Sequence, residues 1–419
     1  MDKFIIQGQK PLNGTVSVSG SKNAALPILA ASILTDENVT LTQMPELSDV
    51  SIMCEILSSL GCSITRDEAD RLTISSNHLR KTQITYDLAG KLRGSFLVMG
   101  PLLARCGHVK ISMPGGCPIG ARPIDLHLKG LSALGAKIKN TRGSIEASAS
   151  ALHGAKVYLD FPSVGATENI MSVAALADGM TIIENAAVEP EIVDLANFLC
   201  SMGAHIAGAG TDTVKISGVP SLHSTEYGII PDRIEAGTLL AAAAVTDGEV
   251  TVTNILPDYV KPITAKLSEM GIPLDIADNA ITVKSSGRFR AVDIKTLPFP
   301  GFPTDMQAQM TSLLSVAEGT GIITETIFEN RFMHTAELCR MGAAIRVAGR
   351  SAVVEGKKTL NGTKVKATDL RAGAALVIAG LAAKGTTEIS DIYHIERGYD
   401  GLEKKLQSLG ADICRRPEG

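Results

Sequence analysis

An eight-residue phrase that recurs six times along the chain constrains the fold more than any other feature. It reads LSSLGCSI, LSALGAKI, LCSMGAHI, LSEMGIPL, LCRMGAAI and LQSLGADI, with its glycine at Gly61, Gly135, Gly203, Gly271, Gly342 and Gly410. The successive glycines are separated by 74, 68, 68, 71 and 68 residues. Such near-equal spacing of one pattern indicates an internal structural repeat of about 70 residues.

Each phrase has the features of a helix end followed by a strand. Leu and then Leu or Met three residues later lie on one face of a helix's last turn. The glycine suits the position just after the helix, where a left-handed backbone closes it. Alternating β-branched residues follow in several copies, as in residues 71–76, 213–218 and 280–286, and this alternation predicts a strand.

A second helix, rich in small residues, is predicted upstream of each phrase. These segments are apolar on most sides, which favours burial, and they cover residues 23–35, 94–107, 166–179, 233–248, 305–321 and 370–386. Each leads into a short segment with strand composition. We therefore expect an α/β fold with the helices inside and the sheets outside, arranged as two inside-out barrel domains of three repeats each.

We expect the chain to cross from one domain to the other at residues 227–232, where repeats one to three end and repeats four to six begin. The strand predicted at residues 4–8 has no helix before it. We expect this strand to complete the last repeat, which would bring the two termini together in one domain.

Composition excludes several classes of protein. The 419 residues carry a net charge of −4, aromatic residues make up 4% and there is no Trp, so a nucleic-acid binder is not expected. The longest apolar runs are shorter than the ~20 residues that a membrane span needs, so no membrane insertion is expected. None of the seven cysteines forms a CxxC pair, which favours a reduced, cytoplasmic setting.

Residues 113–127, MPGGCPIGARPIDLH, form a loop that carries a cysteine and an arginine. Glycines and prolines around Cys117 disfavour helix and strand and allow backbone N–H groups to approach a ligand. A thiol near the guanidinium of Arg122 suits an anionic substrate and a reactive group. The alternative is that Cys117 is structurally idle and that Arg122 belongs to a surface turn.

Charged and polar residues gather where the small-residue helices begin and just after the strands that follow them. Helix starts offer unpaired N–H groups and a positive dipole end, which favour phosphate or carboxylate. The alternative is that each Asp caps its own helix and each Arg pairs with a neighbouring carboxylate. The residues concerned are Lys22, Asn23, Arg93, Ser163, Asp232, Arg233, Glu235, Asp305, Asp369 and Arg371, followed by Arg331 and Arg397.

Common cofactor and metal motifs are missing from the sequence. There is no Walker A loop, no dinucleotide-binding fingerprint after a strand, no HExxH and no GxSxG. We therefore expect an anion-binding site without metal or cofactor, in which Cys117 is a candidate thiol and Asp305 a candidate base.

Several stretches in order resemble the UDP-N-acetylglucosamine enolpyruvyl transferases, a family with an EPSP synthase-like fold. They are SGSKNAALP, PGGCPIGARPIDLH, PSVGATEN, EPEIVDLANFL, PDRIEAG, FPTDMQAQ, ETIFENRFMH, ATDLRAG and HIERGYD. The resemblance covers essentially the whole chain. It implies two inside-out α/β barrel domains, a discontinuous first one at residues 1–21 and 230–419 and a second one at residues 22–229 with the Cys117 loop.

The resemblance implies transfer of enolpyruvate from phosphoenolpyruvate to the 3′-hydroxyl of UDP-N-acetylglucosamine, with release of phosphate. This is the first committed step of peptidoglycan synthesis. Two alternatives are a 3-phosphoshikimate enolpyruvyl transferase, which shares the fold and chemistry but lacks the cysteine loop, and a non-catalytic sugar-nucleotide-binding protein of the same fold. The presence of Cys117 favours the first activity.

The resemblance also implies roles for individual residues. Cys117, Asp305, Lys22 and Arg397 would be catalytic, Asp369 would stabilise the intermediate, and Cys117 would be the thiol that fosfomycin alkylates. Phosphoenolpyruvate would be bound by Lys22, Asn23, Arg122, Arg331, Arg371 and Arg397. UDP-N-acetylglucosamine would be bound by Asn23, Arg93, Arg122, Pro123, Ile124, Asp125, Leu126, Ser163, Val164, Asp305 and Ile327. Where some family members carry a Lys, this chain has Phe161, so the contact that such a Lys makes is not expected here.

Overall fold

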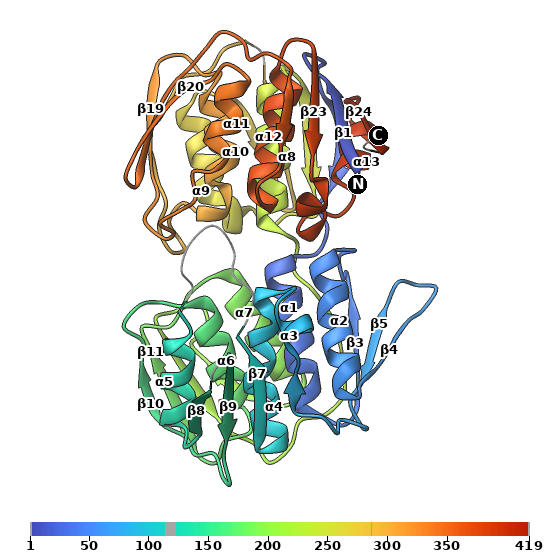
Figure 1. The fold of residues 1–419 in the computed structure, drawn as a ribbon, viewed down its shortest axis with the longest axis vertical. Helices are drawn as coiled ribbons and strands as arrows, with labels where there is room; N and C mark the ends of the chain where they lie inside the picture. The colour runs from blue at the N-terminus through green and yellow to red at the C-terminus, as the bar shows by residue number, and fades with distance from the viewer. Residues whose placement is uncertain (1, 114–122, 142, 286, 418–419) are drawn as a thin grey trace. The chain divides into compact units, whose positions relative to one another are not determined.

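The computed structural model describes residues 2–113, 123–141, 143–285 and 287–417, and the chain divides into two compact units (Figure 1). Unit 1 contains the described residues up to Ser19 and those from Pro231 onward. Unit 2 contains the described residues between Gly20 and Ile230.

Six four-stranded sheets, three in each unit, are formed by the described residues. In unit 2 the order is β14-β3-β5-β4, β6-β7-β9-β8 and β10-β11-β13-β12, from strands Thr225–Gly228, Asn38–Thr42, Leu72–Ser75, Ser63–Arg66, Gln83–Ile84, His108–Ser112, Ser144–Ser148, Lys137–Thr141, Lys156–Tyr158, Met180–Glu184, Thr213–Ser217 and His205–Ala207. In unit 1 it is β2-β15-β17-β16, β18-β19-β21-β20 and β22-β23-β1-β24, from strands Asn13–Ser17, Glu249–Thr253, Ala280–Lys284, Leu274–Ile276, Ile294–Lys295, Thr320–Thr324, Ser351–Glu355, Ala344–Ala348, Lys364–Lys366, Thr386–Ser390, Asp2–Gln7 and Asp412–Pro417.

The recurring phrase forms the same helix end in all six repeats. The helices are α2 (Ser48–Leu60), α5 (Asp125–Ala133), α7 (Pro190–Ser201), α9 (Pro257–Glu269), α11 (His334–Arg340) and α13 (Leu402–Ser408). All six phrase glycines have φ between +87° and +113°. The residue after each glycine donates its N–H to the carbonyl of the phrase's first Leu, as from Cys62 to Leu57 at 3.1 Å. This bond closes each helix and turns the chain into the next strand.

The predicted small-residue helices form the interior of each unit. They are α1 (Lys22–Ala31), α4 (Met99–Cys106), α6 (Val164–Ala174), α8 (Arg233–Val245), α10 (Gln307–Leu314) and α12 (Leu370–Ala382). Nearly all their residues are buried, and each unit has its own hydrophobic core. The expected arrangement of buried helices inside outer sheets is therefore confirmed.

Two of these helices begin with a 3₁₀ turn that the sequence pattern did not predict. The 3₁₀ segment η2 (Arg93–Val98) precedes α4, and η3 (Thr304–Met306) precedes α10. At the start of α4 the N–H of Gly100 donates to the side-chain Oδ1 of Asn169 in α6 at 2.7 Å. The helical pattern therefore starts later than the apolar pattern does.

Strands from distant parts of the chain complete three of the sheets. Strand β1 pairs antiparallel with both β23 and β24, and so completes the last repeat as expected (Figure 1). Strand β2 pairs in parallel with β15, and β14 pairs in parallel with β3. Each unit thereby has three complete four-stranded sheets. Within the described residues, no helix is both long and apolar enough to cross a membrane.

Candidate active site

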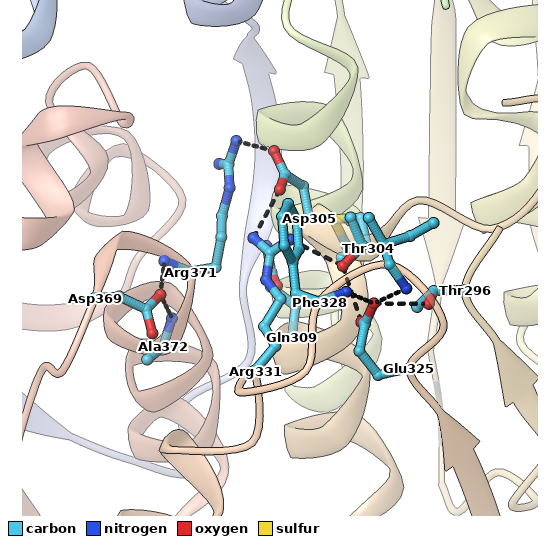
Figure 2. Close-up of polar contacts among 12 residues, drawn as sticks. Thr296, Thr304, Asp305, Gln309, Glu325, Phe328, Arg331, Asp369, Arg371 and Ala372 are labelled. Carbon is cyan, nitrogen blue, oxygen red and sulfur yellow. Dashed lines mark hydrogen bonds and ion pairs between the residues drawn. The ribbon is translucent and has the colours of Figure 1, made fainter. Parts of the chain in front are cut away.

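Asp305 in unit 1 is held by two buried arginines (Figure 2). The Nη2 of Arg331 lies 2.7 Å from its Oδ1, and the Nη2 of Arg371 lies 2.9 Å from its Oδ2. The arginine residues are 6% and 2% exposed, whereas the Asp305 side chain is 25% exposed. Charge-assisted hydrogen bonds to both oxygens fix the carboxylate, and its accessible part can meet a ligand.

Asp305 holds a place near the start of a central helix, as do Asp232 and Asp369, but its side chain is used differently. The Oδ1 of Asp232 accepts two backbone N–H groups at the start of α8, and the Oδ1 of Asp369 accepts two at the start of α12. Asp305 lies in η3, and neither η3 nor α10 has a side-chain cap. The capping alternative therefore holds for Asp232 and Asp369, while the carboxylate of Asp305 faces cationic side chains.

Arg331 is oriented by Thr304, and Thr304 in turn by Glu325. The Nη1 of Arg331 donates to the Thr304 hydroxyl at 2.9 Å, and that hydroxyl donates to the Oε2 of Glu325 at 2.8 Å. Glu325 is only 1% exposed. Its other oxygen, Oε1, accepts the N–H groups of Ile327 and Phe328 at 2.9 and 3.1 Å. Glu325 therefore shapes the segment that carries Ile327 and Arg331.

Arg371 enters the interior of unit 1 from the first turn of α12. Burial acts to lower the pKa of its guanidinium group, but Asp305, Tyr399 and Asp232 outweigh burial and raise the pKa above its ordinary value. The guanidinium carbon lies 5.4 Å from the centre of the Tyr399 ring. The group is therefore a permanent buried cation directed at Asp305.

The charges of Arg397 and Asp369 both act on His394. Arg397 ends the 3₁₀ segment η4 (Ile392–Arg397) and is half-buried. Burial and then the charge of Arg397 lower the pKa of His394, while Asp369 acts to raise it. A second histidine, His334, has its pKa lowered to about 4, chiefly by burial, and Asp369 again acts in the opposite direction. The pKa of each histidine is therefore lowered even though the charge of Asp369 acts to raise it.

Lys22 in unit 2 pairs with a buried carboxylate. Its Nζ lies 3.1 Å from the Oδ2 of Asp49, in the first turn of α2. Lys22 is the first residue of α1, where the helix dipole disfavours a cation. Asp49 offsets this effect and keeps the ammonium group at the helix start. Asn23 follows in the same turn and is half-buried.

Ser163 and Val164 form the start of α6. The hydroxyl of Ser163 accepts the N–H of Ala166 at 3.4 Å and so caps the helix. Arg93 is half-buried at the start of η2, and its charge acts on His127 of α5. Burial first, and Arg93 second, lower the pKa of His127 to about 3.

The segment from Pro123 to Leu126 leads into α5. Pro123 and Asp125 are exposed, Ile124 is buried and Leu126 is half-buried. Phe161 is 49% exposed. Cys117 and Arg122 lie outside the described residues. The structure thus brings Asp305, Arg331 and Arg371 into direct contact in unit 1, and places Lys22, Asn23, Arg93, Ser163 and Val164 in unit 2.

Sequence reasoning did not select Asp49, Thr304, Glu325 or Tyr399, although each contacts a predicted site residue. Asp49 and Glu325 had a usable signal, since each is an acidic residue next to an apolar segment and both are buried. No group of three or more His, Cys, Asp or Glu side chains in the described part of the chain has the arrangement of a metal site.

Comparison with known proteins places this geometry in a class. A family model described as EPSP synthase (3-phosphoshikimate 1-carboxyvinyltransferase) matches residues 6–406. The crystal structure of the enolpyruvyl transferase NikO from Streptomyces tendae superposes with a TM-score of 0.90 at 27% identity, covering 100% of this chain and 99% of that one. EPSP synthase from Acinetobacter baumannii shares the fold, with a TM-score of 0.79 at 18% identity and complete coverage of both chains. The fold is that of the enolpyruvyl transferases.

Curated relatives narrow the class further. UDP-N-acetylglucosamine 1-carboxyvinyltransferase 2 of Carboxydothermus hydrogenoformans is 57% identical over 417 residues, which is 99% of each chain. UDP-N-acetylglucosamine 1-carboxyvinyltransferase 1 of Caldanaerobacter subterraneus subsp. tengcongensis is 56% identical over 414 residues, again 99% of each chain. The chain belongs to the UDP-N-acetylglucosamine 1-carboxyvinyltransferase family, which confirms the predicted resemblance.

Proposed function

We propose that this protein transfers the enolpyruvyl group of phosphoenolpyruvate to the 3′-hydroxyl of UDP-N-acetylglucosamine and releases phosphate. The observation that carries the proposal is the accessible Asp305 carboxylate between Arg331 and Arg371, in a chain 57% identical over 99% of its length to an enzyme of that name. The reaction would take place in the cytoplasm, as the first committed step of peptidoglycan synthesis.

Asp305 is the proposed general base. The 3′-hydroxyl must lose its proton as its oxygen bonds to C2 of phosphoenolpyruvate, and a carboxylate can accept that proton when it lies within hydrogen-bond reach. C3 gains a proton at the same stage, which gives a tetrahedral intermediate that still carries the phosphate. Loss of a C3 proton and departure of phosphate then restore the double bond in the product.

Phosphoenolpyruvate carries a phosphate and a carboxylate, so its site must be strongly cationic. Lys22, Arg122 and Arg397 are the proposed ligands of these groups, and Arg331 and Arg371 add to the positive field. Arginine suits this role because its planar fork can donate to two oxygens at once.

Cys117 is the proposed proton donor to C3 or a participant in product release, and the thiol that fosfomycin alkylates. Neighbouring cations such as Lys22 and Arg122 would favour its thiolate. Asp369 would stabilise the intermediate and Asn23 would orient it. The remaining contacts to the sugar nucleotide are proposed for Arg93, the 122–126 segment, Ser163, Val164 and Ile327.

A phosphate-release assay tests the proposal. The purified protein is incubated with phosphoenolpyruvate and either UDP-N-acetylglucosamine or shikimate 3-phosphate. Phosphate release is expected when UDP-N-acetylglucosamine is the acceptor and not when shikimate 3-phosphate is. Release with shikimate 3-phosphate instead would assign the other enolpyruvyl transfer, and no release above background with either acceptor would leave only a binding role and overturn the proposal.

A further inference from the structure

Tyr399 lies in the buried interior of unit 1, where side chains from three central helices converge on it. Tyr399 is 3% exposed. Its hydroxyl lies 3.0 Å from the Oγ1 of Thr238 in α8 and 3.0 Å from the Nε2 of Gln309 in α10. The face of its ring lies toward Arg371 of α12, with the guanidinium carbon 5.4 Å from the ring centre.

Proton counting fixes the direction of these hydrogen bonds. Thr238 has one hydroxyl proton, and it donates this proton to the carbonyl oxygen of Ile234 at 2.8 Å. The Tyr399 hydroxyl must therefore donate to Thr238, while it accepts the amide N–H of Gln309. With one bond given and one received, the hydroxyl holds the ring in a single orientation.

The guanidinium group of Arg371 has few hydrogen-bond partners. Its Nη2 donates to Asp305, but its Nε and Nη1 are buried with no hydrogen-bond partner among the described residues. An aromatic face attracts a cation, and more strongly where both are shielded from water. The cation–π contact with the Tyr399 ring therefore stabilises the guanidinium group where hydrogen bonds do not.

We propose that Tyr399, anchored by Thr238 and Gln309, is a positioning residue that keeps Arg371 directed at Asp305. This inference rests on the proposed function, in which Asp305 accepts the proton of the sugar hydroxyl. Tyr399 touches no reacting atom in this arrangement. It acts through Arg371: without the Tyr399 ring, the guanidinium group and, in turn, the Asp305 carboxylate would no longer be held in position.

Two substitutions separate the hydroxyl from the ring. Tyr399→Phe keeps the ring and removes its anchor, and kcat is expected to fall about threefold. Tyr399→Leu removes the ring as well, and kcat is expected to fall about thirtyfold. KM for both substrates should change less than kcat, within about twofold, because Tyr399 supports the Arg371–Asp305 pair, whereas the proposed direct ligands of phosphoenolpyruvate are Lys22, Arg122 and Arg397. Tyr86→Phe, on a tyrosine that is 71% exposed, is the matched control and should behave as wild type.

A double-mutant cycle distinguishes positioning from a general loss of structure. In an Arg371→Lys background, Tyr399→Phe should lower kcat no further, because the planar group that the ring supports is already gone. Melting temperatures of all variants are measured alongside. If Tyr399→Leu does not fold, Tyr399→Phe and its Arg371→Lys pair still decide the question.

The outcomes are separable from those of the proposed function. Wild-type protein without turnover would overturn the enolpyruvyl transfer itself. Turnover in the wild type with an unchanged kcat in Tyr399→Phe, an increase in KM in place of a lower kcat, or an equal reduction in the Arg371→Lys background would overturn the role of Tyr399 alone.

Discussion

The ammonium group of Lys22 and the carboxylate of Asp49 form a buried ion pair, with Nζ 3.1 Å from Oδ2 and side chains only 11% and 2% exposed. Removing one partner of such a pair leaves a charge in a site with little water. Asp49→Asn is therefore expected to lower the free energy of unfolding by about 3 kcal/mol. It should also raise KM for phosphoenolpyruvate about tenfold, if a displaced ammonium contributes about 1.4 kcal/mol less to binding.

Urea unfolding and steady-state kinetics measure the two effects of Asp49→Asn. The control is Asp70→Asn, at an exposed surface pair with Arg66, where little change is expected because such pairs are screened by solvent. Equal losses of stability in the two variants would contradict the importance of the Lys22–Asp49 pair.

Asp305→Asn tests the proposed base. An amide cannot accept the hydroxyl proton, so kcat is expected to fall about a thousandfold, with KM changed much less. Stability should fall too, since Arg331 and Arg371 lose their common counter-ion. Asp258→Asn, an exposed residue in the first turn of α9, is the control for the same change. A kcat within tenfold of wild type would rule out Asp305 as the base.

Because His127 is buried in its neutral form, we expect the protein to lose stability in acid. Two hydrogen bonds fix the orientation of the Asn169 amide: its Oδ1 accepts the N–H of Gly100, and its Nδ2 donates to the carbonyl of Phe96. Its Nδ2 therefore donates to the Nδ1 of His127 at 2.9 Å, and this nitrogen must carry no proton. The geometry agrees with a pKa lowered to about 3, chiefly by burial.

Because the folded-state pKa of His127 lies below its unfolded value of about 6.5, its contribution to stability is present above that pH and is lost as the pH falls. Between pH 7.5 and 5 the unfolded chain takes up the proton, which costs the folded state about 2 kcal/mol. Unfolding free energies of His127→Gln should show a pH dependence smaller by that amount. His205→Gln, at an exposed histidine, should keep the wild-type dependence, and an identical dependence in His127→Gln would contradict the prediction.

The phrase glycines predict graded effects of alanine. Gly271 has φ +87° with no atom within 4 Å of an added Cβ, whereas at Gly203, φ +101°, that Cβ would lie 2.9 Å from the His223 ring. Gly271→Ala should thus cost about 1 kcal/mol of stability from backbone strain alone. Gly203→Ala should cost more in thermal or urea unfolding, and the reverse order would show that side-chain packing does not add to the strain.

Cys117→Asp tests the thiol. If Cys117 serves as an acid, a carboxyl group can replace it, so turnover is expected to persist while fosfomycin no longer inactivates the protein. Residual activity and its time course with fosfomycin measure both. Complete loss of turnover with an unchanged melting temperature would instead indicate that a covalent bond to the thiol is required.

The fold was predictable because its signals are local and repeated. A helix end at Gly61 and its equivalents, and a strand a few residues later, follow from patterns within ten residues, and six copies reinforce one another. Strand β1 could be assigned to the last repeat because it lacked a preceding helix. The 3₁₀ turn before α4 was not predicted, and at the start of that helix the N–H of Gly100 bonds to Asn169 of α6, a contact that no local pattern reveals.

The contacts that the predicted site residues make could not be predicted from the sequence. Asp232, Asp305 and Asp369 occur in similar sequence settings, yet two cap helices and one is held by arginines. That difference depends on Arg331 and Arg371, which lie 26 and 66 residues from Asp305. Tyr399 contacts Arg371 only through the fold, 28 residues away in sequence, and no local pattern marks it.

The pairing of β2 with β15 joins residues 236 positions apart, and the whole of unit 2 lies between them. During synthesis on a ribosome, strands β1 and β2 therefore emerge well before their partners exist, whereas every strand of unit 2 is available once Gly228 has been added. Unit 2 is thus expected to fold first. The first strands made are the last to find their sheets, and until then they are exposed edges that a chaperone could cover.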